Sequence, residues 1–113
     1  MRLISLSPSF TEILEALNAA ENLVGVTAAC PELAPPIARV GAPKALELAA
    51  VEALAPDVIL ADTNENRPEE VRALQEKFKV VVYDTRSVPA VMDAIWSMGR
   101  LTGRVTEPTR SRT

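Results

Sequence analysis

The stretch "RLISLSPSFTEIL", residues 2–14, decides the fold of this 113-residue chain. Residues 2–6 form a β-prone apolar run, and the polar turn "SPS" follows. Ile13, Leu14 and Leu17 then recur at the spacing of one helical face. A buried strand that passes through a short polar turn into a helix is the repeating unit of α/β proteins.

The polar turn leaves two helix starts open. Ser9 and Glu12 have the S-x-x-E spacing of a capping box. Alternatively, Ser7 is the N-cap and Pro8 takes the first helical position. A nucleophile elbow is excluded because the chain has no GxSxG motif and no histidine. Either start places a helix N-terminus at the carboxyl end of the first strand, where open α/β sheets bind ligands.

The same alternation continues along the chain. Further β-prone runs are residues 23–26, 57–61 and 79–83, with a short strand expected near residues 39–40. Apolar residues at helical spacing lie between them, namely Leu46, Val51 and Leu54, and then Val71, Leu74 and Phe78. Nearly continuous apolar runs are typical of strands buried on both faces. The pattern predicts an α/β fold with a Rossmann-like open parallel sheet and helices on both faces.

A last helix is expected over residues 87–103, with Ser87 as its cap and Gly103 at its end. Its apolar stripe is expected to comprise Val88, Val91, Met92, Ile95, Gly99 and Thr102. Trp96 falls at the edge of that stripe and Leu101 nearly opposite. Apolar residues outside the core-facing stripe indicate that a second side of this helix also packs against another part of a protein.

Composition excludes several classes of function. The chain has no histidine, which removes Ser-His and Cys-His dyads and the commonest general base, and no phosphate-binding loop. We therefore expect no enzyme. The net charge of −3 argues against a nucleic-acid partner. The one cysteine, Cys30, allows no disulfide within the chain. Asp62, Glu65 and Asp84 lack metal-binding spacing and are expected to be solvated, so neither a metal site nor a cofactor is predicted.

Four segments taken in order resemble a known family. They are "RLISLSPSFTEILEAL", "NLVGVTAACPE", "VGAPKALELAAVEALAPDVILAD" and "VVVYDTRSVPAVMDAIWSMGRLTG". Together they look like the N-terminal lobe of the class III periplasmic substrate-binding proteins. These are the BtuF/FhuD-like helical-backbone metal receptors of ABC importers for cobalamin, haem and ferric siderophores.

The resemblance implies two Rossmann-like lobes joined by a long helix, with the chelate in the cleft between them. It implies that residues 1–86 form the N-terminal lobe, that residues 87–103 begin the backbone helix and that the second lobe is absent. Residues 104–113 are expected to be a disordered polar tail. A periplasmic or extracytoplasmic location is implied, although no signal peptide is visible, which leaves a cytoplasmic location open.

Strand-end geometry and the resemblance together give the candidate cleft residues Ser7, Ser9, Thr27, Pro43, Asp62, Thr63 and Asn64. Two departures from the family pattern stand out. Ala49 occupies the position of the permease-docking glutamate, so Glu47 is the candidate for that role. Asp62 stands where cobalamin binders place an aromatic residue. Polar loops suit a smaller or more hydrophilic chelate.

Three functions remain in order of preference. The first is ligand capture for an ABC importer of a metal chelate, with an ABC permease as partner. The second is an interaction protein that homodimerises through Trp96 and Leu101 on the final helix, since isologous pairing is the commonest route to a closed oligomer. An enzyme of the Rossmann type is the least favoured.

Overall fold

Five parallel strands form the central sheet, in the spatial order β3-β2-β1-β6-β7. They are β1 (Leu3–Ser5), β2 (Leu23–Val26), β3 (Ala38–Arg39), β6 (Val58–Asp62) and β7 (Val80–Tyr83). The computed structural model describes residues 1–27, 37–42 and 44–103. The parallel sheet predicted from the sequence is confirmed, and every predicted strand falls within two residues of its observed place.

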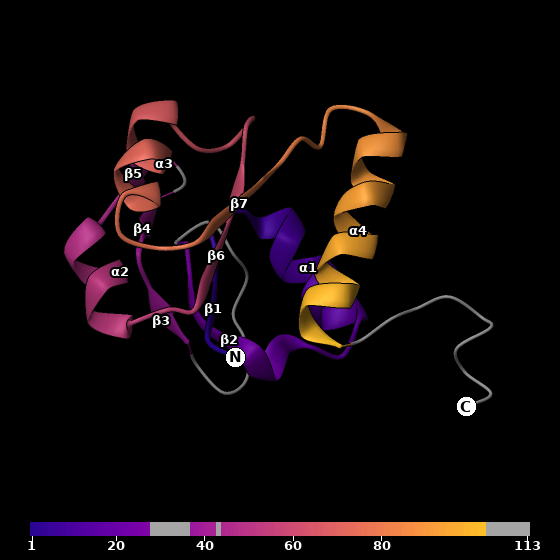
Figure 1. Cartoon of the computed structure of the whole chain (residues 1–113), viewed down its shortest axis with the longest axis horizontal. Helices are drawn as coiled ribbons and strands as arrows, with labels where there is room; N and C mark the ends of the chain where they lie inside the picture. Colours follow the sequence, from indigo (N-terminus) through magenta and orange to yellow (C-terminus); the bar gives the residue numbers. More distant parts are fainter. Residues whose placement is uncertain (28–36, 43, 104–113) are drawn as a thin grey trace.

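Helices cover both faces of this sheet. They are α1 (Pro8–Ala16), α2 (Leu48–Leu54), α3 (Pro68–Gln75) and α4 (Val88–Thr102), and a short 3-10 turn, η1 (Ala20–Asn22), precedes β2. Helices α2 and α3 lie on one side of the strands and α1 and α4 on the other (Figure 1). Within the described ranges, none of the helices has the length and apolarity needed to cross a bilayer.

Two apolar cores result, one on each face of the sheet. Alternate residues of β6 point in opposite directions, so Val58 and Leu60 join the core beneath α1 and α4, whereas Ile59 and Ala61 join the core beneath α2 and α3. All five residues of β6 are buried. Burial on both faces explains why the strands read as continuous apolar runs.

Helix α1 begins at the second of the two starts that the sequence left open. Ser7 is the N-cap, with extended backbone angles of φ −143° and ψ 137°, and Pro8 occupies the first helical position. The capping box of Ser9 and Glu12 does not form, because Ser9 already lies inside the helix. Proline at this position costs the helix no hydrogen bond, since the first N–H groups of a helix have no acceptor within it.

The segment before α2 differs from the prediction. Leu46 is not helical but lies in β5 (Ala45–Leu46), which pairs antiparallel with β4 (Gly41–Ala42). Gly41 has a φ of +98°, and a Cβ there would come within 2.6 Å of the carbonyl oxygen of Ala45. Only glycine allows this approach without strain, and Leu46 is thereby turned into the core beneath α2 and α3.

Helix α4 has its predicted ends. The Ser87 hydroxyl accepts a hydrogen bond of 3.2 Å from the Ala90 N–H, and Gly103 ends the helix in the left-handed conformation with φ 74°. Whether α4 begins a longer backbone helix, and where the domain boundaries lie, stay predictions. Residues 104–113, expected to be a tail, lie outside the described residues.

The expected apolar stripe of α4 is only partly right. Gly99 is buried as expected, but the other buried positions are Ala94 and Met98, whereas Val88 and Met92 are 76% and 50% exposed. Leu101, expected nearly opposite the stripe, packs against the core shared with α1.

Candidate functional site

The loops after β6 and β7 meet at the carboxyl edge of the sheet and are joined by hydrogen bonds. The Thr85 hydroxyl donates to Oδ2 of Asp62 at 2.9 Å, and Nδ2 of Asn64 donates to the Thr85 hydroxyl oxygen at 3.3 Å. Because adjacent parallel strands end at the same edge, residues distant in sequence meet here. The sequence therefore placed Asp62 and Asn64 correctly at one edge.

Asp62 is the buried centre of this network, with only 1% of its surface exposed. Its Oδ1 accepts from the Asn64 N–H at 2.9 Å, and its own N–H donates to Oδ1 of Asn66 at 2.8 Å. Nδ2 of Asn66 donates in turn to the carbonyl oxygen of Leu6 at 3.1 Å. Both carboxylate oxygens are thus bonded within the chain, so Asp62 positions the loops of three strands and presents no free oxygen to a ligand.

Thr63 and Asn64 are the exposed side chains that this network supports. The Thr63 N–H donates to the carbonyl oxygen of Tyr83 at 3.0 Å, which fixes its backbone to β7. Nζ of Lys44 donates to the carbonyl oxygens of Asn64 and Glu65 at 2.9 and 3.2 Å. The loop is held at both ends, and its hydroxyl and amide groups face outward.

Ser7 lies beneath the edge, not on it. The residue is fully buried, and its Oγ has no hydrogen-bond partner in the described part of the chain. Its carbonyl oxygen accepts from the Ser5 hydroxyl at 2.8 Å, and the Thr11 hydroxyl donates to Ser5 Oγ at 2.9 Å. This buried chain of hydroxyl groups fixes the turn between β1 and α1.

Thr27 ends β2 next to a positively charged residue. The side chain of Arg39 donates from Nη1 to the carbonyl oxygen of Thr27 at 3.1 Å, which joins the ends of β2 and β3. Thr27 itself is fully buried. Pro43, the remaining cleft candidate, lies outside the described residues.

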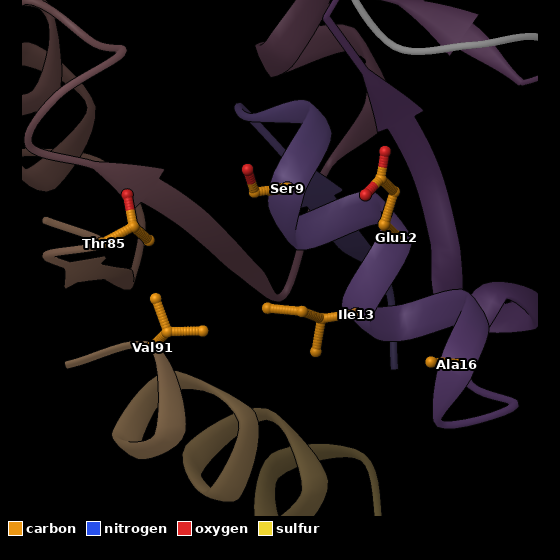
Figure 2. A pocket seen from close by; sticks show the side chains of 6 residues that line it. All are labelled: Ser9, Glu12, Ile13, Ala16, Thr85 and Val91. Atoms are coloured by element: carbon orange, nitrogen blue, oxygen red, sulfur yellow. The ribbon is translucent and has the colours of Figure 1, made fainter. Parts of the chain in front are cut away.

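Ser9 faces a groove between α1 and α4, which has a volume of about 370 Å³. Figure 2 shows that Ile13 of α1 and Val91 of α4 point toward each other across the groove. The lining also includes the polar side chains of Ser9 and Glu12 on α1 and of Thr85 in the loop after β7.

The loop from β7 to α4 carries an ion pair. Nη2 of Arg86 lies 2.7 Å from Oδ2 of Asp84, and the Arg86 N–H also donates to Oδ1 of Asp84 at 2.9 Å. These hydrogen bonds lower the pKa of Asp84 from 3.8 to about 2. Among the described residues, no three acidic or thiol side chains gather closely enough to hold a metal ion.

Glu47, the candidate docking residue, is exposed at the N-cap position of α2. Its N–H donates to the carbonyl oxygen of Val40 at 2.8 Å, so the backbone is fixed while the carboxylate remains accessible. Ala49 is also exposed, two residues further on. Because α2 leads directly into β6 and runs opposite to it, its N-terminus lies on the carboxyl side of the sheet.

Sequence reasoning did not name Asn66, Thr85 or Arg39 among the candidate site residues. A signal was present for Asn66, because an Asn or Asp just after a strand commonly bonds to nearby backbone groups. No local pattern could reveal Thr85, since its partner Asp62 lies 23 residues away.

The chain belongs to the periplasmic binding protein family, whose sequence pattern it matches over residues 3–108. This agrees with the fold, with the resemblance stated above and with the expectation of a binding protein rather than an enzyme. No curated protein sequence matches the chain significantly.

Solved structures support the same assignment. The vitamin B12 binding protein BtuF of Vibrio cholerae is 28% identical, with a TM-score of 0.76 over 96% of this chain. A periplasmic solute-binding protein of Staphylococcus epidermidis, described as a possible iron-binding protein, is 29% identical, with a TM-score of 0.76 over 91% of this chain. The haem-binding protein BhuT, solved with two haems, is 25% identical, with a TM-score of 0.77 over 90% of this chain.

The chain spans less than half the length of these relatives, namely 42% of the BtuF chain, 42% of the S. epidermidis chain and 41% of BhuT.

Proposed function

We propose that this chain is the N-terminal lobe of the substrate-binding component of an ABC-type importer for a metal chelate: cobalamin, haem or a ferric siderophore. Membership of the periplasmic binding protein family supports this. So do the B12-binding and haem-binding proteins among its relatives. An extracytoplasmic location follows from the same proposal.

The observation that carries the proposal is the rigid polar edge after β6. The buried bonds of Asp62 and Asn66 hold Thr63 and Asn64 in an exposed position. Prearranged hydrogen-bonding groups cost less conformational entropy when they bind a ligand. In this arrangement Ser9, Thr63 and Asn64 touch the ligand, and Asp62 supports the loop of Thr63 and Asn64 from beneath.

The chemistry of the edge favours a hydrophilic chelate. Two aromatic side chains are engaged within the fold, since Phe10 is fully buried and the Tyr83 ring packs edge-on against it with 5.3 Å between centroids. The Tyr83 hydroxyl is bonded to the Ser97 hydroxyl at 2.7 Å. A flat macrocycle gains much of its affinity from aromatic stacking, whereas a siderophore with many carbonyl oxygens suits hydroxyl and amide donors.

Calorimetric titration with cyanocobalamin, haem and ferrichrome tests this proposal. We expect ferrichrome to bind most tightly, and Asn64→Ala to weaken its binding about tenfold, the effect of losing one or two hydrogen bonds. Lys79→Ala is the matched control, because Lys79 is exposed at the amino end of β7. The absence of binding for all three chelates at high micromolar concentration would reject the proposal.

Glu47 is the proposed contact with the ABC permease. Its exposed carboxylate lies on the carboxyl side of the sheet, at the start of α2. Surface plasmon resonance against a permease encoded in the same genome tests the role. We expect Glu47→Lys to abolish binding and Glu76→Lys, at the end of α3, to leave it unchanged.

A second candidate function is an interaction protein that forms a homodimer. Exposure of Met92 on α4 supports an interaction through this helix, although Leu101 packs inward and does not contribute.

A further inference from the structure

The groove between α1 and α4 has an apolar wall on one side and a carboxylate on the other. Four residues of α1 line it, at the spacing of one helical face: Ser9, Glu12, Ile13 and Ala16. With about 3.6 residues per turn, Ile13 and Glu12 fall on opposite flanks of that face, about 100° apart. Val91 of α4 lies across from Ile13 (Figure 2). The apolar wall is therefore on the α4 side, and Glu12 is at the outer rim.

Glu12 brings a negative charge to this groove that no neighbour neutralises. Its side chain is exposed and forms no ion pair with another described residue. Helix α1 carries a second carboxylate, Glu15, and no lysine or arginine. Arg86, which follows the lining residue Thr85, is already paired with Asp84 at 2.7 Å. The groove therefore favours a positively charged group.

The groove opens beside the proposed binding edge. Ser9 belongs to both, and the lining residue Thr85 donates its hydroxyl hydrogen bond to Asp62, which holds the loop after β6. Glu12 lies three residues beyond Ser9, about 4.5 Å further along the helix axis. A short alkyl arm that leaves a chelate at the edge can thus follow the groove as far as Glu12.

We propose that the groove binds the pendant arm of a hydroxamate siderophore, an alkyl arm that ends in an ammonium group. The inference rests on the proposed function, because the iron-binding part of the same molecule occupies the carboxyl edge. The methylene groups of the arm lie against Ile13 and Val91, and the ammonium group donates a hydrogen bond to the carboxylate of Glu12. An apolar stem with a charged head matches an apolar wall with a carboxylate at its rim. The volume of about 370 Å³ is within the range of about 300–1,000 Å³ that is usual for small-molecule sites.

Two chelates that differ only at the end of this arm test the proposal. Ferrioxamine B is a ferric hydroxamate with an alkyl arm that ends in an ammonium group, and its N-acetyl derivative has the same arm without the charge. Calorimetric titration of the 113-residue chain with each chelate gives the ratio of their dissociation constants. We expect the N-acetyl derivative to bind about fivefold more weakly, because it cannot pair with the exposed carboxylate of Glu12.

Three variants separate the contributions of charge and apolar contact. Glu12→Gln keeps the size of the side chain and removes its charge, so the two dissociation constants should become equal within about 1.5-fold. Glu15→Gln is the matched control and should keep the fivefold difference, because Glu15 is exposed on the same helix but does not line the groove. Val91→Thr replaces one methyl group with a hydroxyl, so it should weaken both chelates alike, by about threefold.

The outcomes distinguish this inference from the proposed function. Equal affinity of the unmodified chain for the two ferrioxamines would overturn the inference and leave chelate binding at the edge intact. So would a difference that persists in Glu12→Gln, or one that Glu15→Gln abolishes as well, since the charge would then act from a distance and not in the groove. Absence of binding for ferrichrome and for both ferrioxamines would reject the proposed function and the inference together.

Discussion

The hydroxyl of Thr85 donates a hydrogen bond of 2.9 Å to Oδ2 of Asp62, a residue 23 positions earlier in the chain. This bond joins the loop after β6 to the loop after β7. Together with the bonds from Asp62 and Asn66, it makes the carboxyl edge of β1, β6 and β7 a single unit. These hydrogen bonds hold the exposed side chains of Thr63 and Asn64 in place.

Asp62→Ala should lower the free energy of unfolding by about 2–3 kcal/mol, because it removes a buried hydrogen-bonded carboxylate and leaves its donors unsatisfied. Urea denaturation measures the change. Asp93→Ala is the control, since Asp93 is exposed, and should stay within about 0.5 kcal/mol of the unmodified chain. Equal effects of the two substitutions would show that Asp62 is not the centre of the network.

The two buried serines of the first turn should respond differently to alanine. Ser5→Ala should lower the free energy of unfolding by about 1–2 kcal/mol, because Ser5 Oγ donates to the carbonyl oxygen of Ser7 and accepts from the Thr11 hydroxyl. Ser7→Ala should be neutral or stabilising by up to about 1 kcal/mol, because it removes a buried hydroxyl without a partner among the described residues. Thermal denaturation compares the two variants, and a larger loss for Ser7→Ala than for Ser5→Ala would contradict the assignment.

Gly41→Ala should destabilise the chain by about 2 kcal/mol or more. The φ of +98° disfavours a side chain, and the added Cβ would meet backbone atoms of Ala45 and Glu47 at 2.6 and 2.8 Å. Gly103→Ala should cost only about 1 kcal/mol, because that position has a positive φ but open space around it. Chemical denaturation of both variants separates backbone strain from steric overlap.

The pKa of Asp84 gives a prediction for low pH. Hydrogen bonds from Arg86 lower it from 3.8 to about 2, so the charged form is favoured in the folded chain. Because the pKa of Asp84 is lower in the folded chain than in the unfolded chain, the ion pair stabilises the fold above about pH 4. This contribution is lost as the pH falls toward 2. Because both side chains are largely exposed, the contribution to stability is small.

Nuclear magnetic resonance titration of the Asp84 carboxyl group measures this pKa directly. Arg86→Ala should return it to the usual range for aspartate, near 3.9. An unchanged pKa in that variant would show that another group lowers it.

The sequence predicted the fold well because the central strands β1, β2 and β6 are largely or fully buried between the two layers of helices. Alternate residues of β6 enter different cores, which requires an uninterrupted apolar run that is easy to recognise. The start of α1 was narrowed to two choices, and Ser7 with Pro8 is the correct one. The pairing of β4 with β5 was missed, because strands of two residues carry no periodicity.

Strand-end geometry and the resemblance together predicted that Asp62, Thr63 and Asn64 lie at the carboxyl edge of the sheet, but not their hydrogen bonds. That this edge binds a ligand stays a prediction. That Asp62 is buried depends on Asn66, Thr85 and Leu6, of which two are distant in sequence. The orientation of α4 was predicted only in part, because Gly99 is buried as expected, whereas Ala94 and Met98 are buried in place of Val88 and Met92.

The most direct test of the central claim, that the carboxyl edge binds a metal chelate, is a titration of ¹⁵N-labelled chain with gallium-loaded ferrichrome, the diamagnetic counterpart of the ferric form. We predict saturable shifts of the amide signals of Ser9, Thr63 and Asn64, with the signals of Lys77 and Lys79 at the opposite edge unchanged. Unperturbed signals at the carboxyl edge, or shifts confined to another surface, would contradict the account.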